Sequence, residues 1–200
     1  MPSQRHTVAE PPPVVTDPLL RAAHACVMDV GLRRTTLADV ARRAGVSRMT
    51  VYRQFDDLTG IVSALLTAEL VALLDSAWAD TAALGTARGR LVEAGALVVE
   101  RIVHHPLYRR VLDVDPELLL PLVVDRFGST QRAAVQVVAG MVAQGVEEGS
   151  VRPVDPQLAA TCLMLTAQSF VFSARVVERE TPPGATAAEL RRLFDGYLAP

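Results

Sequence analysis

The chain has 200 residues, of which 50% are hydrophobic and 21% are charged, and its formal net charge is −2. It is long enough for one domain, or for a small domain joined to a larger one, and too apolar to be disordered over most of its length. All twenty basic residues are arginine, which excludes Schiff-base and P-loop chemistries that need a lysine. Taken over the whole chain, the near-neutral charge argues against a nucleic-acid binder.

The cysteines and the apolar segments indicate where the protein resides. Cys26 and Cys162 lie far apart in the sequence and predict two buried cytosolic thiols. The first ten residues lack the apolar stretch of an export signal. Residues 156–174 are uncharged over the length of a membrane span, but their polar side chains favour a buried helix or a helix–helix interface. We therefore expect a cytoplasmic protein with no membrane segment.

The N-terminal half begins with a predicted flexible tail, residues 1–16, which includes three consecutive prolines. Asp17 and Pro18 then form a typical helix start, an N-cap followed by proline at the first helical position. Apolar spacing and capping residues predict four helices, over about residues 18–30, 36–44, 47–55 and 57–73.

The rest of the chain keeps the helical pattern. Further helices are predicted over about residues 86–105, 106–111, 127–148, 155–179 and 187–198, with an apolar segment at 116–125 that Pro121 interrupts. No stretch alternates as a paired strand does, and no internal repeat is visible. The predicted fold class is therefore all-α.

Residues 35–55 are the most informative segment, because two short predicted helices are joined there by a turn that contains Gly45. Four apolar side chains form the expected inner face: Val40, Val46, Val51 and Phe55. The second helix is left with an outer face of Arg48, Met49, Thr50, Tyr52, Arg53 and Gln54. A recognition helix in the DNA major groove needs such a mixture of donors and apolar tips. The alternative is an ordinary solvated surface on a short helix.

This segment resembles the N-terminal signature of the TetR family of transcriptional regulators. The signature runs T-T-x-x-x-[IV]-A-x-x-A-G-V-S-x-x-T-[LV]-Y-x-x-F after an alanine-rich helix that ends in glycine. The matching residues are Thr35, Thr36, Val40, Ala41, Ala44, Gly45, Val46, Ser47, Thr50, Val51, Tyr52 and Phe55. The match covers about the first quarter of the chain. It implies a tail at 1–16, a helix-turn-helix DNA-binding domain at 17–62, and a helical effector-binding and dimerisation domain at 63–200.

The resemblance also implies roles for individual side chains. Thr36, Thr50 and Tyr52 would contact phosphates. Arg48, Met49 and Arg53 would face the bases, with Gln54 at the edge of the groove. Further candidates for phosphate contact, each equally well read as a solvated residue, are Arg33, Arg34, Arg42 and Arg43.

One departure from the family pattern follows Phe55. The family usually carries a small polar residue and then a lysine at the start of the fourth helix, whereas this chain has Asp56, Asp57 and Leu58. Two carboxylates near DNA would repel it, although they suit the positive end of a helix dipole. The departure leaves open a second reading, a helical small-molecule-binding protein with weakened or lost DNA binding.

The predicted effector domain offers candidate ligand contacts among the few large or polar residues of its aliphatic helices. They are Trp78, His104, Tyr108, Phe127, Met141, Gln144, Gln168 and Phe172, with ordinary core packing as the alternative for each. Such a pocket suits a small, largely apolar effector. His104 and His105 are adjacent, so they point in different directions and do not share an ion. With no catalytic motif present, we expect no enzyme, no metal and no cofactor.

The last two predicted helices carry apolar stripes that suit a four-helix seam between two copies of the chain. The stripes consist of Leu158, Cys162, Leu165, Ser169, Phe172, Val176, Leu190, Leu193, Phe194 and Tyr197. The charge divides accordingly: residues 21–60 hold seven arginines and four aspartates, while residues 61–200 hold twelve arginines and sixteen acidic residues. The charge division predicts a basic reading head, and the family resemblance implies a homodimeric repressor with a palindromic double-stranded DNA operator and a small-molecule effector.

Overall fold

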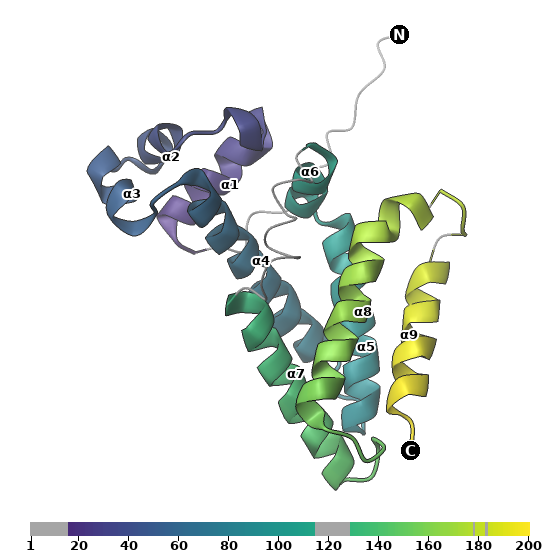
Figure 1. The fold of residues 1–200 in the computed structure, drawn as a ribbon. Coiled ribbons are helices and arrows are strands. Elements are labelled where there is room, and N and C mark those ends of the chain that lie inside the picture. The colour runs from purple at the N-terminus through teal and green to yellow at the C-terminus, as the bar shows by residue number, and fades with distance from the viewer. Residues whose placement is uncertain (1–15, 115–128, 178, 183) are drawn as a thin grey trace.

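The computed structural model describes residues 16–114, 129–177, 179–182 and 184–200, which form nine α-helices and one 3-10 helix without any strand (Figure 1). The all-α prediction is thereby confirmed. The elements in chain order are α1 (Pro18–Val30), η1 (Leu32–Arg34), α2 (Leu37–Ala44), α3 (Arg48–Gln54), α4 (Leu58–Asp80), α5 (Ala87–His104), α6 (Pro106–Val114), α7 (Ser129–Glu147), α8 (Pro156–Val177) and α9 (Ala185–Leu198). The predicted apolar segment 116–125 and nearly all of the predicted tail lie outside the described residues.

The first three α-helices begin and end where the sequence predicts. The Asp17 carboxylate caps α1 by accepting a 2.7 Å hydrogen bond from the Leu19 amide, and Gly31 ends the helix with φ +83°. The buried Thr35 hydroxyl then donates to the Gly31 carbonyl at 2.9 Å, which fixes the bend before α2. Gly45 takes the left-handed conformation (φ 70°) between α2 and α3, so the turn needs a residue without a Cβ.

A hydrophobic core joins the first four α-helices to α6. Val27, Val40 and Val51 are fully buried in it, and Leu107 and Val111 enter it from α6. Val30, in the last turn of α1, is 39% exposed. The α4 helix runs unbroken from Leu58 to Asp80, so the predicted boundary between residues 62 and 63 falls inside it. We call α1–α3 with the start of α4 the head, and α5–α9 with the rest of α4 the body.

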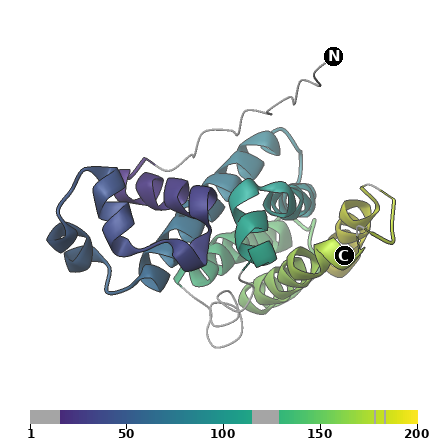
Figure 2. The same ribbon diagram turned by 90° about the horizontal axis from the view of Figure 1, so that it is seen from above.

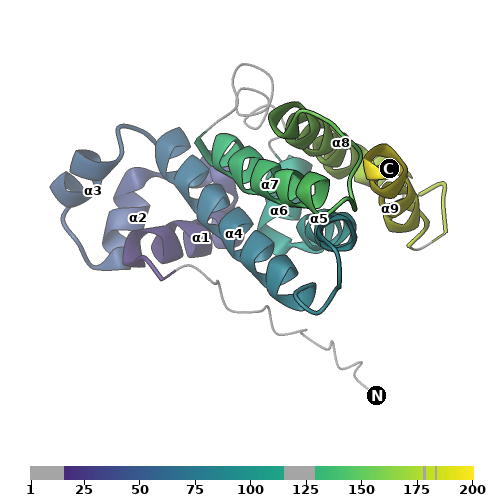
Figure 3. The same cartoon turned by 90° about the horizontal axis from the view of Figure 1, so that it is seen from below.

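The body is arranged around α5, which packs against α4, α7, α8 and α9 (Figures 1 and 3). A second core holds Leu91, Val142 and Phe194. An added Cβ on Gly95 would lie 2.6 Å from the Phe194 ring, so α5 and α9 approach closely only because this residue is glycine. Seen from above and below, α2 and α3 lie at one end of the molecule and α9 at the other (Figures 2 and 3).

Two of the described helices, Leu58–Asp80 and the Pro156–Ala174 part of α8, are long and apolar enough to cross a membrane by length and composition. One face of α4 is buried in the core of the head, and α8 packs against α5, α7 and α9. The exposed apolar side chains of α8 and α9 are Leu158, Leu165, Phe172, Val176 and Leu193. Leu190 and Phe194, predicted on the same seam, are buried in the second core instead. Cys26 is buried, but Cys162 is only half-buried.

Candidate functional site

The α3 helix lies at one end of the molecule (Figure 1) and its sequence is mostly polar. The Ser47 hydroxyl accepts a 3.1 Å hydrogen bond from the Thr50 amide, and Val51 is fully buried and anchors the helix to the head. The side chains predicted to read DNA therefore lie on the outer face: Arg48, Met49, Tyr52, Arg53 and Gln54 are exposed, and Thr50 is half-buried. Met49 is 77% and Tyr52 52% exposed, unusually high values for such apolar side chains.

The arginines of the head differ in how far their charge is already neutralised. Arg42 lies 2.7 Å from the Asp39 carboxylate, and Arg43 lies 2.5 Å from that of Asp29. Within the described part of the chain, Arg48 and Arg53 form no ion pair. The charges of Arg48 and Arg53 on α3 therefore remain available for a polyanion.

Carboxylates occupy the starts of α2 and α4. Thr36 and Asp39 form a capping box in which the Thr36 hydroxyl donates to the carboxylate at 2.6 Å, and this hydrogen bond lowers the pKa of Asp39. Asp57 caps α4 and accepts from the Gly60 amide at 2.7 Å. Leu58, at the position of the family's lysine, packs against the core of the head. The Thr36 hydroxyl and the start of α4 are thus both engaged by acidic side chains.

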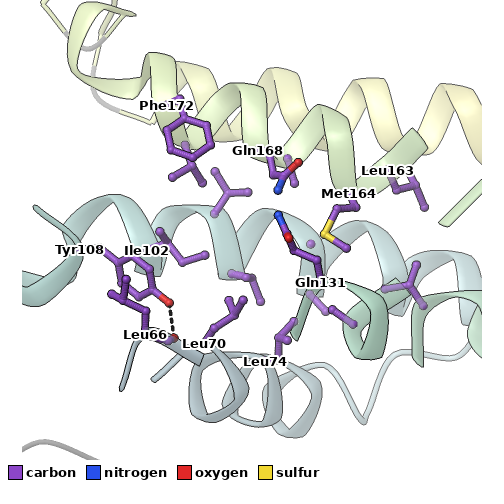
Figure 4. A pocket seen from close by; sticks show the side chains of 18 of the residues that line it. Leu66, Leu70, Leu74, Ile102, Tyr108, Gln131, Leu163, Met164, Gln168 and Phe172 are labelled. Carbon is purple, nitrogen blue, oxygen red and sulfur yellow. Dashed lines mark hydrogen bonds between the residues drawn. The ribbon is translucent and has the colours of Figure 1, made fainter. Parts of the chain in front are cut away.

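The body contains a cavity of about 260 Å³ (Figure 4). Its described lining comes from α4–α9 and carries no charged side chain. Four of the predicted ligand residues line it, namely Trp78, Tyr108, Gln168 and Phe172. Sequence reasoning missed most of the others, which include Leu66, Leu70, Ile102, Gln131, Leu163 and Met164. Their helical spacing is the same as that of core residues, so only Gln131, a polar residue among apolar ones, carried a usable signal.

The other four predicted ligand residues do not line this cavity. His104 lines a second cavity of about 330 Å³ near the α8–α9 connection. Met141 packs against the second core, and the side-chain oxygen Oε1 of Gln144 accepts a hydrogen bond from Arg90 at 3.4 Å. Phe127 lies outside the described residues.

Tyr108 connects the cavity to the helix that leads into the head. Its ring lines the cavity and its hydroxyl donates to the Leu66 carbonyl of α4 at 2.7 Å (Figure 4). Burial, with a smaller contribution from the Glu69 charge, raises the pKa of Tyr108, so the hydroxyl remains a donor. On the same helix, Leu107 and Val111 are buried in the core of the head. The α6 helix therefore touches the cavity with one face and the head with another.

A buried carboxyl group lies beside this connection. The Glu69 side chain is 1% exposed, and its Oε2 lies 3.7 Å from the His105 Nε2. Its other oxygen, Oε1, has no hydrogen-bond partner among the described residues. Burial raises the pKa of Glu69, because the charged form loses its hydration.

Relatives by sequence are regulators of the helix-turn-helix class. The family model described as "Bacterial regulatory proteins, tetR family" matches residues 19–65. An uncharacterized HTH-type transcriptional regulator of Mycobacterium bovis is 37% identical over 180 residues, which cover 90% of this chain and 92% of that protein. A regulator of the same description from Mycobacterium tuberculosis is 36% identical over an equal length.

Solved structures of low sequence identity share the fold. The regulator FadR of Bacillus subtilis, in complex with stearoyl-CoA, matches with a TM-score of 0.65 and 16% identity, over 90% of this chain and 98% of that one. The repressor AlkX of a Dietzia strain, implicated in biodegradation of n-alkanes, matches with a TM-score of 0.64 and 20% identity, over 90% of each chain. Together with the sequence relatives, they show that the chain belongs to the TetR family of helix-turn-helix transcriptional regulators, a family without enzymatic activity.

Proposed function

We propose that this protein is a cytoplasmic homodimeric repressor that binds a palindromic operator and is released from it by a small, largely apolar ligand. The observation that carries the proposal is that one molecule holds both an exposed α3 with free arginines and an uncharged cavity, connected through α6 and α4. The proposed domains are residues 17–62 for DNA binding and 63–200 for effector binding and dimerisation, with α4 shared between them.

The proposed DNA contacts follow from exposure and charge. Arg48 and Arg53 are exposed and without a local ion pair, so they are the side chains we assign to base edges, together with Met49 and Gln54. Tyr52 and Thr50 lie on the same helix and supply hydroxyl groups for phosphates. Thr36 also contacts a phosphate if its hydroxyl gives up the hydrogen bond to the Asp39 carboxylate and donates to the phosphate instead.

The proposed dimer interface is the exposed apolar face of α8 together with Leu193 of α9. Leu158 and Val176, near the two ends of α8, are 59% and 64% exposed, so the uncovered stripe extends along nearly the whole helix. Contiguous apolar surface of this kind marks an interaction site, and a two-fold dimer presents the same face from both copies. Two copies of α3 would then meet successive major-groove turns about 34–36 Å apart.

The proposed ligand site is the cavity lined by Trp78, Tyr108, Gln168 and Phe172. FadR binds stearoyl-CoA and AlkX is implicated in alkane degradation, which supports an apolar ligand for a fold of this kind. A ligand that presses on Tyr108 acts on α6 and, through the Leu66 carbonyl, on α4. Such a ligand releases DNA only if it binds the non-binding arrangement more tightly than the binding one.

The test is a selection of bound sites from random duplex DNA with the purified full chain at low salt, followed by gel-shift titration of the recovered sequence. We expect a two-fold symmetric site with half-sites about ten base pairs apart, or a multiple of that spacing. Recovery of no symmetric sequence contradicts the proposal. It would favour the second candidate, a helical ligand-binding protein with weakened DNA binding, which Asp57 and Leu58 at the start of α4 support.

A further inference from the structure

The chemistry of the cavity lining defines the ligand more narrowly than the proposed function does. We infer that the ligand is an uncharged, mainly aliphatic molecule with one neutral oxygen group, which the side-chain amides of Gln131 and Gln168 bind. This inference rests on the proposed function, because it takes the cavity of the body as the effector site.

The lining excludes charged ligands. Its described residues include no Arg, Asp, Glu or His, and the hydroxyl of Tyr108 is already donated to the Leu66 carbonyl. A carboxylate or an ammonium group would lose its hydration in this cavity and find no group of opposite charge among the described lining residues. The ligand that fits best is therefore neutral at the pH of the cell.

The polar groups of the described lining are few: besides the Tyr108 hydroxyl they include Ser63 and Thr67 of α4 and two glutamine side chains. Gln131 of α7 and Gln168 of α8 are half-buried, and their terminal amides point toward one another across the cavity (Figure 4). An amide offers both a donor and an acceptor, so a hydroxyl, ketone or ester oxygen between the two helices can be satisfied from either side. The labelled side chains around the two amides, such as Leu70, Leu74 and Met164, are apolar (Figure 4).

The size of the cavity supports a small ligand. Its volume of about 260 Å³ lies just below the range of about 300–1,000 Å³ that is usual for ligand pockets. The cavity has room for a short aliphatic chain or a compact ring with its oxygen group.

The chain carries a natural probe for this test, because Trp78 is its one tryptophan and lines the cavity. Tryptophan fluorescence of the full chain is titrated at pH 8 with four matched eight-carbon compounds: octane, 1-octanol, octanoate and octylamine. We expect 1-octanol to bind about tenfold more tightly than octane, because its hydroxyl pairs with an amide. We expect octanoate and octylamine to bind at least about tenfold more weakly than 1-octanol, because their charges are buried without a partner.

Two variants and a control locate the polar contact. Gln131→Leu and Gln168→Leu should keep the affinity for octane and lose most of the preference for 1-octanol. Gln136→Leu is the control, because Gln136 lies on α7 as well but is exposed and bonded to Gln157 at 3.0 Å. It should bind all four compounds as the parent chain does.

Failure of this inference and failure of the proposed effector site give different results in these titrations. Tight binding of octanoate or octylamine, or an unchanged preference for 1-octanol in both glutamine variants, overturns this inference and leaves the apolar effector site standing. Absence of binding by all four compounds, with the far-UV circular dichroism of a folded helical protein, overturns the inference and also the proposed effector site.

Discussion

The head and the body carry their functional side chains in opposite ways. In the head, the proposed DNA contacts lie mostly on one seven-residue helix, α3, and point outward. In the body, the cavity is lined by side chains from six helices, and they point inward. A site on one short helix can be predicted from a few consecutive residues of the sequence. A site lined by six helices depends on how those helices pack against one another.

The two regions nevertheless share a core. Leu107 and Val111 of α6 are buried among head residues, although α6 follows the head in the sequence by more than forty residues. Because the packing is continuous between the head and the body, the two regions differ in where their functional surfaces lie. The predictions below test this view, beginning with the largest expected effect.

Leu107→Ala tests whether α6 belongs to the core of the head. Leu107 is fully buried, so we expect the free energy of unfolding to fall by about 2–5 kcal/mol, the usual result of emptying a packed leucine site. The measurement is the denaturant midpoint with the slope held constant. Leu84→Ala is the control. Because Leu84 is 41% exposed, its truncation should lower the free energy of unfolding only slightly. Equal effects of the two substitutions would show that α6 is not part of this core.

Arg48→Ala and Arg53→Ala test the outward face of α3. Loss of a bidentate arginine–guanine contact should weaken binding to the selected operator by about 1–3 kcal/mol for each, with specificity relaxed at particular bases. Thermal stability should not change. Arg101→Ala serves as the control, because Arg101 pairs with Asp80 in the body. Uniform weakening on all sequences would reassign both arginines to phosphate contacts.

Gly95→Ala tests the tight packing of the body. The new Cβ would lie 2.6 Å from Phe194. We therefore expect the free energy of unfolding to fall by about 1–3 kcal/mol, as in other overpacked cores. Gly140→Ala, on α7, has no heavy atom within 4 Å of its new Cβ and should stabilise by about 0.5–1 kcal/mol through helix propensity. Calorimetry of both variants measures the contrast, and a stabilising Gly95→Ala would contradict the described approach of α5 and α9.

Asp57→Asn tests the carboxylate at the start of α4. Asparagine caps a helix about as well as aspartate, so stability should hold while the repulsion from DNA phosphates is removed. We expect operator affinity to rise by about 0.5–1 kcal/mol, an ordinary value for a surface charge, and the gain to shrink as salt is added. An unchanged affinity at low salt would place Asp57 away from the bound DNA.

The smallest expected effect is on the pH dependence of stability. Because burial raises the pKa of Glu69, the native state holds this proton more tightly than the unfolded chain does. The contribution of Glu69 to stability is therefore fully present below the unfolded pKa, about 4.3 for glutamate, and is lost as the pH rises through the folded value. Charged His105, with its Nε2 3.7 Å from Glu69 Oε2, opposes this trend while it remains protonated. Glu69→Gln should flatten the slope in denaturation curves between pH 4 and 8, whereas Glu100→Gln, at an exposed position, should not.

Much of the head could be predicted from the sequence because its signals are local. The Asp17 cap, the Thr36 capping position and the turn at Gly45 each depend on residues no more than a few positions apart, and the structure confirms all three.

The arrangement of the body was harder to predict because its signals are not local in the sequence. Leu190 and Phe194 carry the same apolar spacing whether they face a second copy or their own core, and the structure places them in the core. Residue type suggests Met141 and Gln144 as ligand contacts, but Met141 packs against the second core, Gln144 bonds to Arg90, and neither lines the cavity. Which face of a helix looks inward depends on neighbours more than fifty residues distant, and spacing within one helix does not contain that information.

Because α4 is one unbroken helix, a small movement of the body is enough to displace the first turn of this helix. A helix of 23 residues is about 34 Å long at 1.5 Å per residue. A tilt of about 5° at its distal end displaces its first turn by about 3 Å, which is as large as the length of a whole hydrogen bond. Arginine side chains that read base edges lose their contacts over such a distance. Under the proposed mechanism, a ligand the size of a short aliphatic chain would therefore be sufficient to decide whether the opposite end of the molecule stays on DNA.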